Sequence, residues 1–225
     1  MKILIIVLSC LFLGGCNKNL YQEVYDNIAE IRNIMYEGED KDGQIYASLM
    51  CGEREEEYIL NGAATNLIPF GIITFKCDTN IQKVEYILKA NGNTYSGELQ
   101  KNPFEDNFMA DIGEIVVTDY VLIKFLWEDS ATQVKMNRID TGFKHNIDSV
   151  IKNVVGKYEK ELKTFRSKNT FNGEVYIKII AEGYNVNAEK MWYVNIISGK
   201  GDSLSIVLSP ENMQVLSIQK NLNNS

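Results

Sequence analysis

Histidine and proline are nearly absent from this sequence, whose 225 residues include one histidine and three prolines. Cysteine is also scarce, at four residues, and two of these lie within the first sixteen, so too few ligands remain for a zinc site of the usual spacing. The 23 basic residues are outnumbered by 30 acidic ones, and the resulting net charge of −7 argues against nucleic-acid binding. We therefore expect no metal, no cofactor and no nucleic-acid partner.

Long hydrophobic runs are missing as well, since none reaches the roughly 20 residues that a membrane-spanning helix needs. The composition is that of an ordinary globular chain with a packed core, at 45% hydrophobic and 24% charged residues. These values exclude a disordered, collagenous or multi-span membrane protein. The length fits one large domain or two small ones.

The N-terminus has the pattern of a secretory signal. Lys2 is followed by eleven residues, Ile3 to Leu13, of which only Ser9 is polar. The run ends in Leu13-Gly14-Gly15-Cys16, which resembles the lipobox of bacterial lipoproteins: an aliphatic residue, two small residues and a cysteine. A plain cleaved signal, or a buried helix with an incidental cysteine, is the alternative.

The lipobox resemblance implies a processing pathway and a location. Residues 1–15 would be removed by cleavage between Gly15 and Cys16, and Cys16 would carry fatty acyl chains such as palmitate. Burial of two such chains, at about 0.8 kcal/mol per methylene, gives stable anchoring in a membrane. We therefore expect a lipid-anchored, extracytoplasmic protein on the outer face of the cell membrane, or on the outer membrane of a Gram-negative source.

An amphipathic helix is predicted within the anchored N-terminal segment, residues 16–40. Its apolar positions recur at helical spacing: Leu20, Val24, Ile28, Ile31 and Met35. Gly38 is placed to end the helix. The polar face is acidic and would be repelled by anionic lipid, so we expect this helix to pack on the following domain.

Residues 41–140 show short period-two segments separated by turns. The predicted strands are 44–51, 67–77, 84–90, 94–99, 114–127 and 133–139, and Asn91-Gly92-Asn93 is a predicted hairpin turn. About a hundred residues of this pattern predict an antiparallel β-sandwich, immunoglobulin-like by pattern only. Cys51 and Cys77 are a candidate disulfide of this domain, and two buried thiols are the alternative.

Residues 141–220 are predicted to form a helix packed on an antiparallel meander, with 221–225 as a tail. The helix has an apolar stripe from Phe143 to Phe165, and the strands are 174–181, 190–197, 203–208 and 213–219. The aromatic strand at 192–196, the hairpin and the strand pair within 205–216 resemble secreted bacterial PepSY domains, and cystatin-like folds share the layout. This resemblance implies a binding or inhibitory accessory module without catalytic residues. The predicted fold class is therefore α+β.

Catalytic patterns are lacking. His145 is the sole histidine and no sequence motif supplies a nucleophile or an orienting carboxylate for it. Trp192 and Tyr193 point to opposite faces of one predicted strand, so one of them is a candidate ligand contact and the other a core residue; core packing of both is the alternative.

We interpret the protein as a non-catalytic binding or accessory module for a protein, peptide or envelope component. A structural role in envelope assembly is one alternative. The other is a hydrolase of envelope polymers that uses paired carboxylates, Glu174 or Glu182 with Asp111 or Glu114.

Overall fold

The computed structural model describes residues 19–56, 66–78, 81–168 and 170–222. Gly15 and Cys16, with the predicted signal segment, lie outside these residues. The helices are α1 (Leu20–Asp26) and α2 (Ile147–Leu162), with short 3-10 turns at Asp140–Gly142 and Lys163–Phe165. The strands are β1 (Ile28–Glu39), β2 (Ile45–Glu55), β3 (Leu67–Cys77), β4 (Val84–Ala90), β5 (Asn93–Lys101), β6 (Phe108–Asp111), β7 (Tyr120–Trp127), β8 (Ser130–Arg138), β9 (Arg166–Ser167), β10 (Thr170–Phe171), β11 (Gly173–Ala181), β12 (Lys190–Ser198), β13 (Ser203–Leu208) and β14 (Val215–Asn221).

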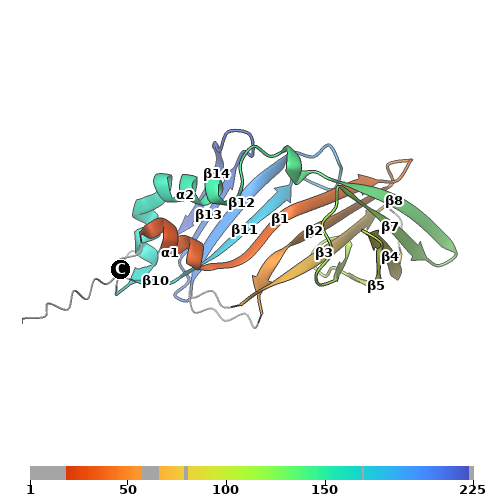
Figure 1. Ribbon diagram of the computed structural model, residues 1–225, viewed down its shortest axis with the longest axis horizontal. Coiled ribbons are helices and arrows are strands. Elements are labelled where there is room, and N and C mark those ends of the chain that lie inside the picture. Colours follow the sequence, from red (N-terminus) through yellow and green to blue (C-terminus); the bar gives the residue numbers. More distant parts are fainter. Residues whose placement is uncertain (1–18, 57–65, 79–80, 169, 223–225) are drawn as a thin grey trace, which may run out of the picture.

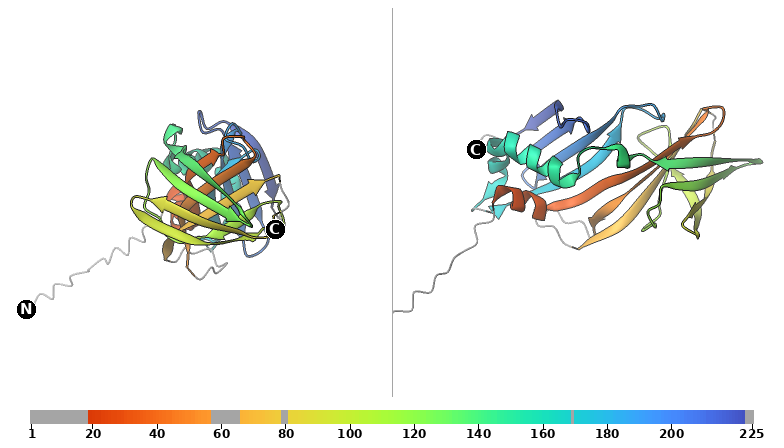
Figure 2. Two further views of the ribbon diagram at one scale, coloured as in Figure 1. Left: turned by 90° about the vertical axis from the view of Figure 1, so that its right-hand side faces the viewer. Right: turned by 45° about the horizontal axis from the view of Figure 1, so that its top comes forward.

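Eight strands close into an antiparallel barrel at one end of the molecule (Figure 1). Their order is β1-β2-β3-β6-β5-β4-β7-β8, and β8 returns to β1 through the pairs Tyr36 with Arg138 and Glu37 with Asn137. Alternate side chains of each strand point inward and form one apolar core that includes Leu49, Phe75 and Phe125. The ring of strands is seen end on in Figure 2.

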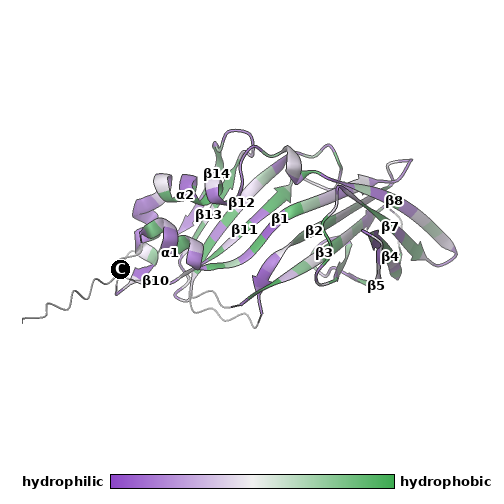
Figure 3. Ribbon diagram, in the orientation of Figure 1, coloured by the Kyte–Doolittle hydropathy of each residue, from purple (hydrophilic) through white to green (hydrophobic). Residues whose placement is uncertain are grey.

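The same sheet continues beyond the barrel. The first half of β1 pairs in parallel with β11, and β12, β13 and β14 follow in antiparallel order. Helices α1 and α2 lie over one face of this extension (Figure 2), where Val150, Ile151 and Val154 of α2 pack into a second apolar core. Apolar and hydrophilic residues alternate along many of its strands (Figure 3), as expected for a sheet with one covered face.

The predicted N-terminal helix is wrong beyond residue 26. Asn19 caps α1, accepting a hydrogen bond from the Gln22 backbone N–H at 2.8 Å, and the chain then becomes β1 at Ile28. Neighbours Tyr36 and Glu37, which point to opposite sides of β1, are both buried. A strand covered on both sides loses the period-two pattern, so its apolar residues matched helical spacing by coincidence.

The predicted fold class is also wrong. Residues 41–140 do not form a sandwich, because their strands and β1 close into the barrel. The helix and meander do not stand apart after it, because β11 extends the same sheet through its parallel pairing with β1. Short alternating strands are common to sandwiches and barrels, so their pattern does not show which strand closes the sheet.

No helix in the described segments has both the length and the apolar character needed to cross a bilayer.

Candidate functional site

A cavity of about 450 Å³ lies on the outer surface of the barrel, where β2, β3 and β6 meet two loops. One loop joins β5 to β6 and the other joins β11 to β12. The lining residues are Met35, Tyr46, Ser48, Thr74, Asn102, Glu105, Asn107, Met109, Ala181, Gly183 and Tyr184. We call this cavity the cleft.

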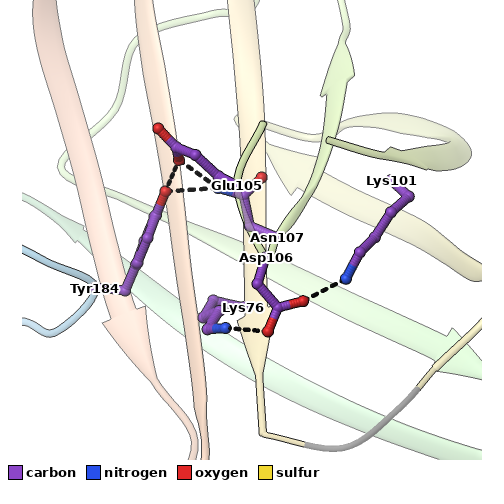
Figure 4. Close-up of polar contacts among 6 residues, drawn as sticks. All are labelled: Lys76, Lys101, Glu105, Asp106, Asn107 and Tyr184. Carbon is purple, nitrogen blue, oxygen red and sulfur yellow. Dashed lines mark hydrogen bonds and ion pairs between the residues drawn. The ribbon is translucent and has the colours of Figure 1, made fainter. Parts of the chain in front are cut away.

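The loop between β5 and β6 is tied to the barrel by Asp106 (Figure 4). Its two carboxylate oxygens accept hydrogen bonds from Lys101 Nζ at 2.5 Å and Lys76 Nζ at 2.7 Å. These two ammonium groups lower the pKa of Asp106 to about 2, so the ion pairs persist over the ordinary pH range. These ion pairs of Asp106 hold the adjoining loop residues Glu105 and Asn107 beside the cleft.

Glu105, Asn107 and Tyr184 join the two loops, and we call these three residues the clasp (Figure 4). Asn107 Nδ2 donates to Glu105 Oε2 at 2.8 Å and to the Tyr184 hydroxyl at 2.6 Å, and that hydroxyl donates to Glu105. The Tyr184 ring also packs edge-on against Tyr46, with ring centroids 5.9 Å apart. Segments 77 residues apart in the chain therefore close over one side of the cleft.

The start of β12, directly after the loop that joins β11 to β12, is fixed to β1 by buried polar contacts around Glu37. Lys190 Nζ lies 2.5 Å from Glu37 Oε1, and the Tyr46 hydroxyl donates to Glu37 Oε2 at 3.2 Å. Burial raises the pKa of Glu37, and the neighbouring Lys190 and Tyr46 partly oppose this shift. Burial, reinforced by the charge of Glu37, also raises the pKa of Tyr46, which stays a neutral hydrogen-bond donor.

Asn107 places a buried hydrogen-bond acceptor at the cleft, and the described part of the chain supplies no partner for it. Its side chain is buried, with 2% of the residue exposed, and its Oδ1 atom has no hydrogen-bond donor among the described residues. Buried amide oxygens are normally paired, because an unpaired one loses its hydration without compensation.

The remaining lining supplies polar and apolar groups that can contact a ligand. Ser48 and Thr74 supply hydroxyls, while Met35 and Met109 supply apolar, adaptable surface. The described lining contains no histidine, cysteine or lysine, and its one carboxylate, Glu105, accepts hydrogen bonds from Asn107 and Tyr184 in the clasp. Among the described residues, no cluster of three or more His, Cys, Asp or Glu is placed to hold a metal ion.

Trp192 and Tyr193 lie outside the cleft. Trp192 faces the helices, is 3% exposed and packs edge-on against Phe143, with ring centroids 5.5 Å apart. Tyr193 is half-buried on the opposite face of β12, where its hydroxyl donates to Ser205 Oγ at 3.3 Å and Lys178 Nζ lies 5.2 Å from its ring centroid. The two side chains do point to opposite faces, as predicted from the strand pattern.

Cys51 and Cys77 are not joined by a disulfide. In the register of β2 and β3, Cys51 pairs with Gly71 and Cys77 pairs with Ile45, so six residue steps separate the two thiols along the sheet. That spacing is roughly 20 Å, far beyond the Cα separation that a disulfide spans. The predicted disulfide is therefore wrong, because the register of β2 and β3 places the two thiols far apart along the strands. Burial raises the pKa of the Cys51 thiol to about 12.

The carboxylates proposed for the hydrolase alternative lie in different settings. Glu174 is 2% exposed and accepts a hydrogen bond from the Tyr176 hydroxyl at 2.8 Å. Asp111 lies 2.5 Å from the guanidinium of Arg54 in an ion pair. Glu182 and Glu114 are both exposed. None of the four lines the cleft.

The cleft residues were missed from the sequence because they come from five separate segments. One local pattern pointed to them: the turn-rich stretch Asn102-Pro103-Phe104-Glu105-Asp106-Asn107 combines loop-forming residues with an aromatic and two carboxylates. Comparisons with known proteins add nothing further, because no protein-family model, curated protein or solved structure matched this chain.

Proposed function

We propose that this chain is a lipid-anchored, extracytoplasmic binding protein that holds a polar segment of a peptide or envelope component in the cleft, without catalysis. The observation that carries the proposal is the buried Asn107 Oδ1, which has no donor among the described residues and belongs to a residue that lines the cavity. The cavity volume of about 450 Å³ lies within the range of ligand sites in proteins.

The chemistry of the lining defines the kind of ligand. Asn107 Oδ1 and the Glu105 carboxylate are acceptors, so the ligand must present donors such as amide N–H, hydroxyl or ammonium groups. Met35 and Met109 favour an adjoining apolar group. A backbone amide next to an aliphatic side chain meets both requirements, as does an acetamido sugar.

The clasp can open to admit a ligand to the cleft. Tyr184 is 39% exposed and belongs to a loop, so its side chain can swing away at the cost of contacts with Glu105 and Asn107. Opening uncovers the Asn107 amide, and a bound donor can then pair with Asn107 Oδ1 and take the place of the Tyr184 hydroxyl at Glu105. Binding and opening are therefore coupled.

The test is affinity capture from an envelope extract with wild-type protein and matched variants. Asn107→Leu removes the amide at nearly constant volume, Thr74→Val removes a hydroxyl of the lining, and Glu85→Gln alters an exposed residue of β4 outside the lining. Loss of one or two hydrogen bonds predicts about tenfold weaker retention by Asn107→Leu. Equal recovery by all four proteins, or turnover of a glycan or peptide by the wild type, would overturn the proposal.

A further inference from the structure

A second cavity, of about 260 Å³, lies at the start of α2, away from the cleft. It is lined by the first turn of α2, by the segment leading into it and by Asn33 and Trp192 of the underlying sheet. None of these residues lines the cleft.

The start of α2 presents hydrogen-bond donors to this cavity. The helix is sixteen residues long, and the Asn146 side chain caps it by accepting from the Ser149 backbone N–H at 3.0 Å. The cap leaves the N–H groups of the first two helical residues, Ile147 and Asp148, without an intrahelical acceptor. Together with the helix dipole, such groups favour a negatively charged oxygen.

Trp192 supplies an independent observation at the same cavity. The residue is 3% exposed and lines the cavity, and its indole Nε1–H has no acceptor anywhere in the described part of the chain. An indole nitrogen is a donor only, so the group that completes it must be an acceptor. Phe143 packs edge-on against the ring at 5.5 Å and limits its reorientation.

The carboxylate of the lining, Asp140, and that of the first turn of α2, Asp148, are already countered by basic side chains. Asp140 Oδ2 lies 2.7 Å from Arg138 Nη2, and Asp140 Oδ1 accepts from the Met35 backbone N–H at 3.0 Å. Asp148 lies 2.6 Å from Lys152 Nζ. These contacts reduce the repulsion that either carboxylate would exert on a second anion.

Two basic residues complete the lining. Lys144 and His145 both border the cavity, and Lys144 also forms an ion pair with Glu211 at the neighbouring turn. From the donors, the orphan indole N–H and this lining, we infer that the cavity is a binding site for the carboxylate of a small ligand or a peptide C-terminus. The carboxylate accepts from the helix N–H groups and from Trp192 Nε1.

Tryptophan fluorescence provides the test, because the chain has only two tryptophans. In a full-length Trp127→Phe variant, Trp192 is the sole reporter. The probes are N-acetylglycine and its neutral amide, N-acetylglycinamide. We expect a saturable change in Trp192 emission with the carboxylate, at a concentration at least about tenfold below that for the amide, as loss of a charge-assisted bond predicts.

Calorimetric titration of two further variants shows which donors take part. Trp192→Phe removes the indole N–H and should weaken N-acetylglycine binding at least about fivefold, the effect of one typical hydrogen bond. Ile147→Pro removes one helix N–H, and the position accepts proline because Asn146 before it is already extended at φ −92° and ψ 177°. Thermal melts confirm folding.

Three results would overturn the inference: no saturation with either probe, equal responses to carboxylate and amide, or undiminished binding by both folded donor variants. Because these probes do not report on the cleft, failure here leaves the proposed function standing, and failure of the cleft variants leaves this inference standing.

Discussion

The ion pair between Glu37 of β1 and Lys190 of β12 offers a quantitative test of the packing between the barrel and the strand extension. The side chains are 4% and 10% exposed, and their charged atoms are 2.5 Å apart. Lys190→Met keeps most of the side-chain volume and leaves the carboxylate buried without its cation. Breaking a buried pair in this way costs about 3–5 kcal/mol, and we expect the lower end because the Tyr46 hydroxyl still donates to Glu37.

The sign of the pH dependence follows from the direction of the Glu37 shift. Burial raises the pKa of Glu37 above its ordinary value of 4.5, and Lys190 opposes this shift, so the pKa rises further in Lys190→Met. A raised carboxyl pKa means that the folded state binds the proton more tightly than the unfolded chain. The added instability is therefore small below pH 4.5 and grows as the pH rises from there toward the folded pKa.

Urea unfolding at pH 4 and pH 7 measures both quantities. Lys83→Met is the matched control, because Lys83 pairs with Glu85 and Glu98 in the open, with 58% of its side chain exposed, and its loss should leave the unfolding midpoint nearly unchanged. Adding Glu37→Gln to Lys190→Met should recover most of the lost stability. Equal effects of the two lysine variants, or a larger loss at pH 4 than at pH 7, would refute the reasoning.

Three further predictions concern single residues. Cys16→Ala should release the chain from the membrane fraction or leave it unprocessed, as fractionation and mass determination would show; normal size and retention would contradict the lipid anchor. Gly52→Ala should destabilise by more than about 2 kcal/mol, because a Cβ would lie 1.7 Å from a backbone oxygen of β1, whereas Gly156→Ala in α2 meets nothing within 4 Å and should stabilise by about 0.5–1 kcal/mol in the same urea assay. At pH 8, Cys51 should react with iodoacetamide much more slowly than Cys77, because burial raises its pKa to about 12; peptide mapping that finds equal rates would contradict that burial.

Much of the secondary structure follows from local patterns. The strands predicted at 67–77, 84–90 and 203–208 have those bounds in the structure, and Asn91 and Gly92 have the positive φ values, 47° and 80°, that the predicted hairpin turn requires. These features depend on alternation and on turn chemistry, which are written into a few consecutive residues.

The closure of the sheet does not follow from such patterns. It depends on β1, whose neighbouring residues Tyr36 and Glu37 are both buried because β1 is covered on both sides. It also depends on the pairing of Tyr36 with Arg138, about a hundred positions later in the chain. No local period encodes that pairing, and the short β6 was missed for the same reason.

The candidate site was equally hidden. Asn107 and Tyr184 are ordinary loop residues in the sequence, and only the fold brings them to hydrogen-bond distance, 2.6 Å. One of Trp192 and Tyr193 was a candidate ligand contact because they point to opposite faces of one strand, yet neither lines the cleft. The type of a residue shows what chemistry its side chain can perform. A binding site built from loops, however, forms only through the long-range contacts that bring those loops together.

Site-specific photo-crosslinking tests the binding role of the cleft most directly. A benzophenone amino acid at Tyr184, in the clasp, is compared in intact cells with the same group at Phe104, which belongs to the adjoining loop, is 93% exposed and lies outside the lining. We predict a discrete adduct from position 184 and none from position 104. Adducts from position 104 alone, or from neither position, would contradict ligand binding in the cleft.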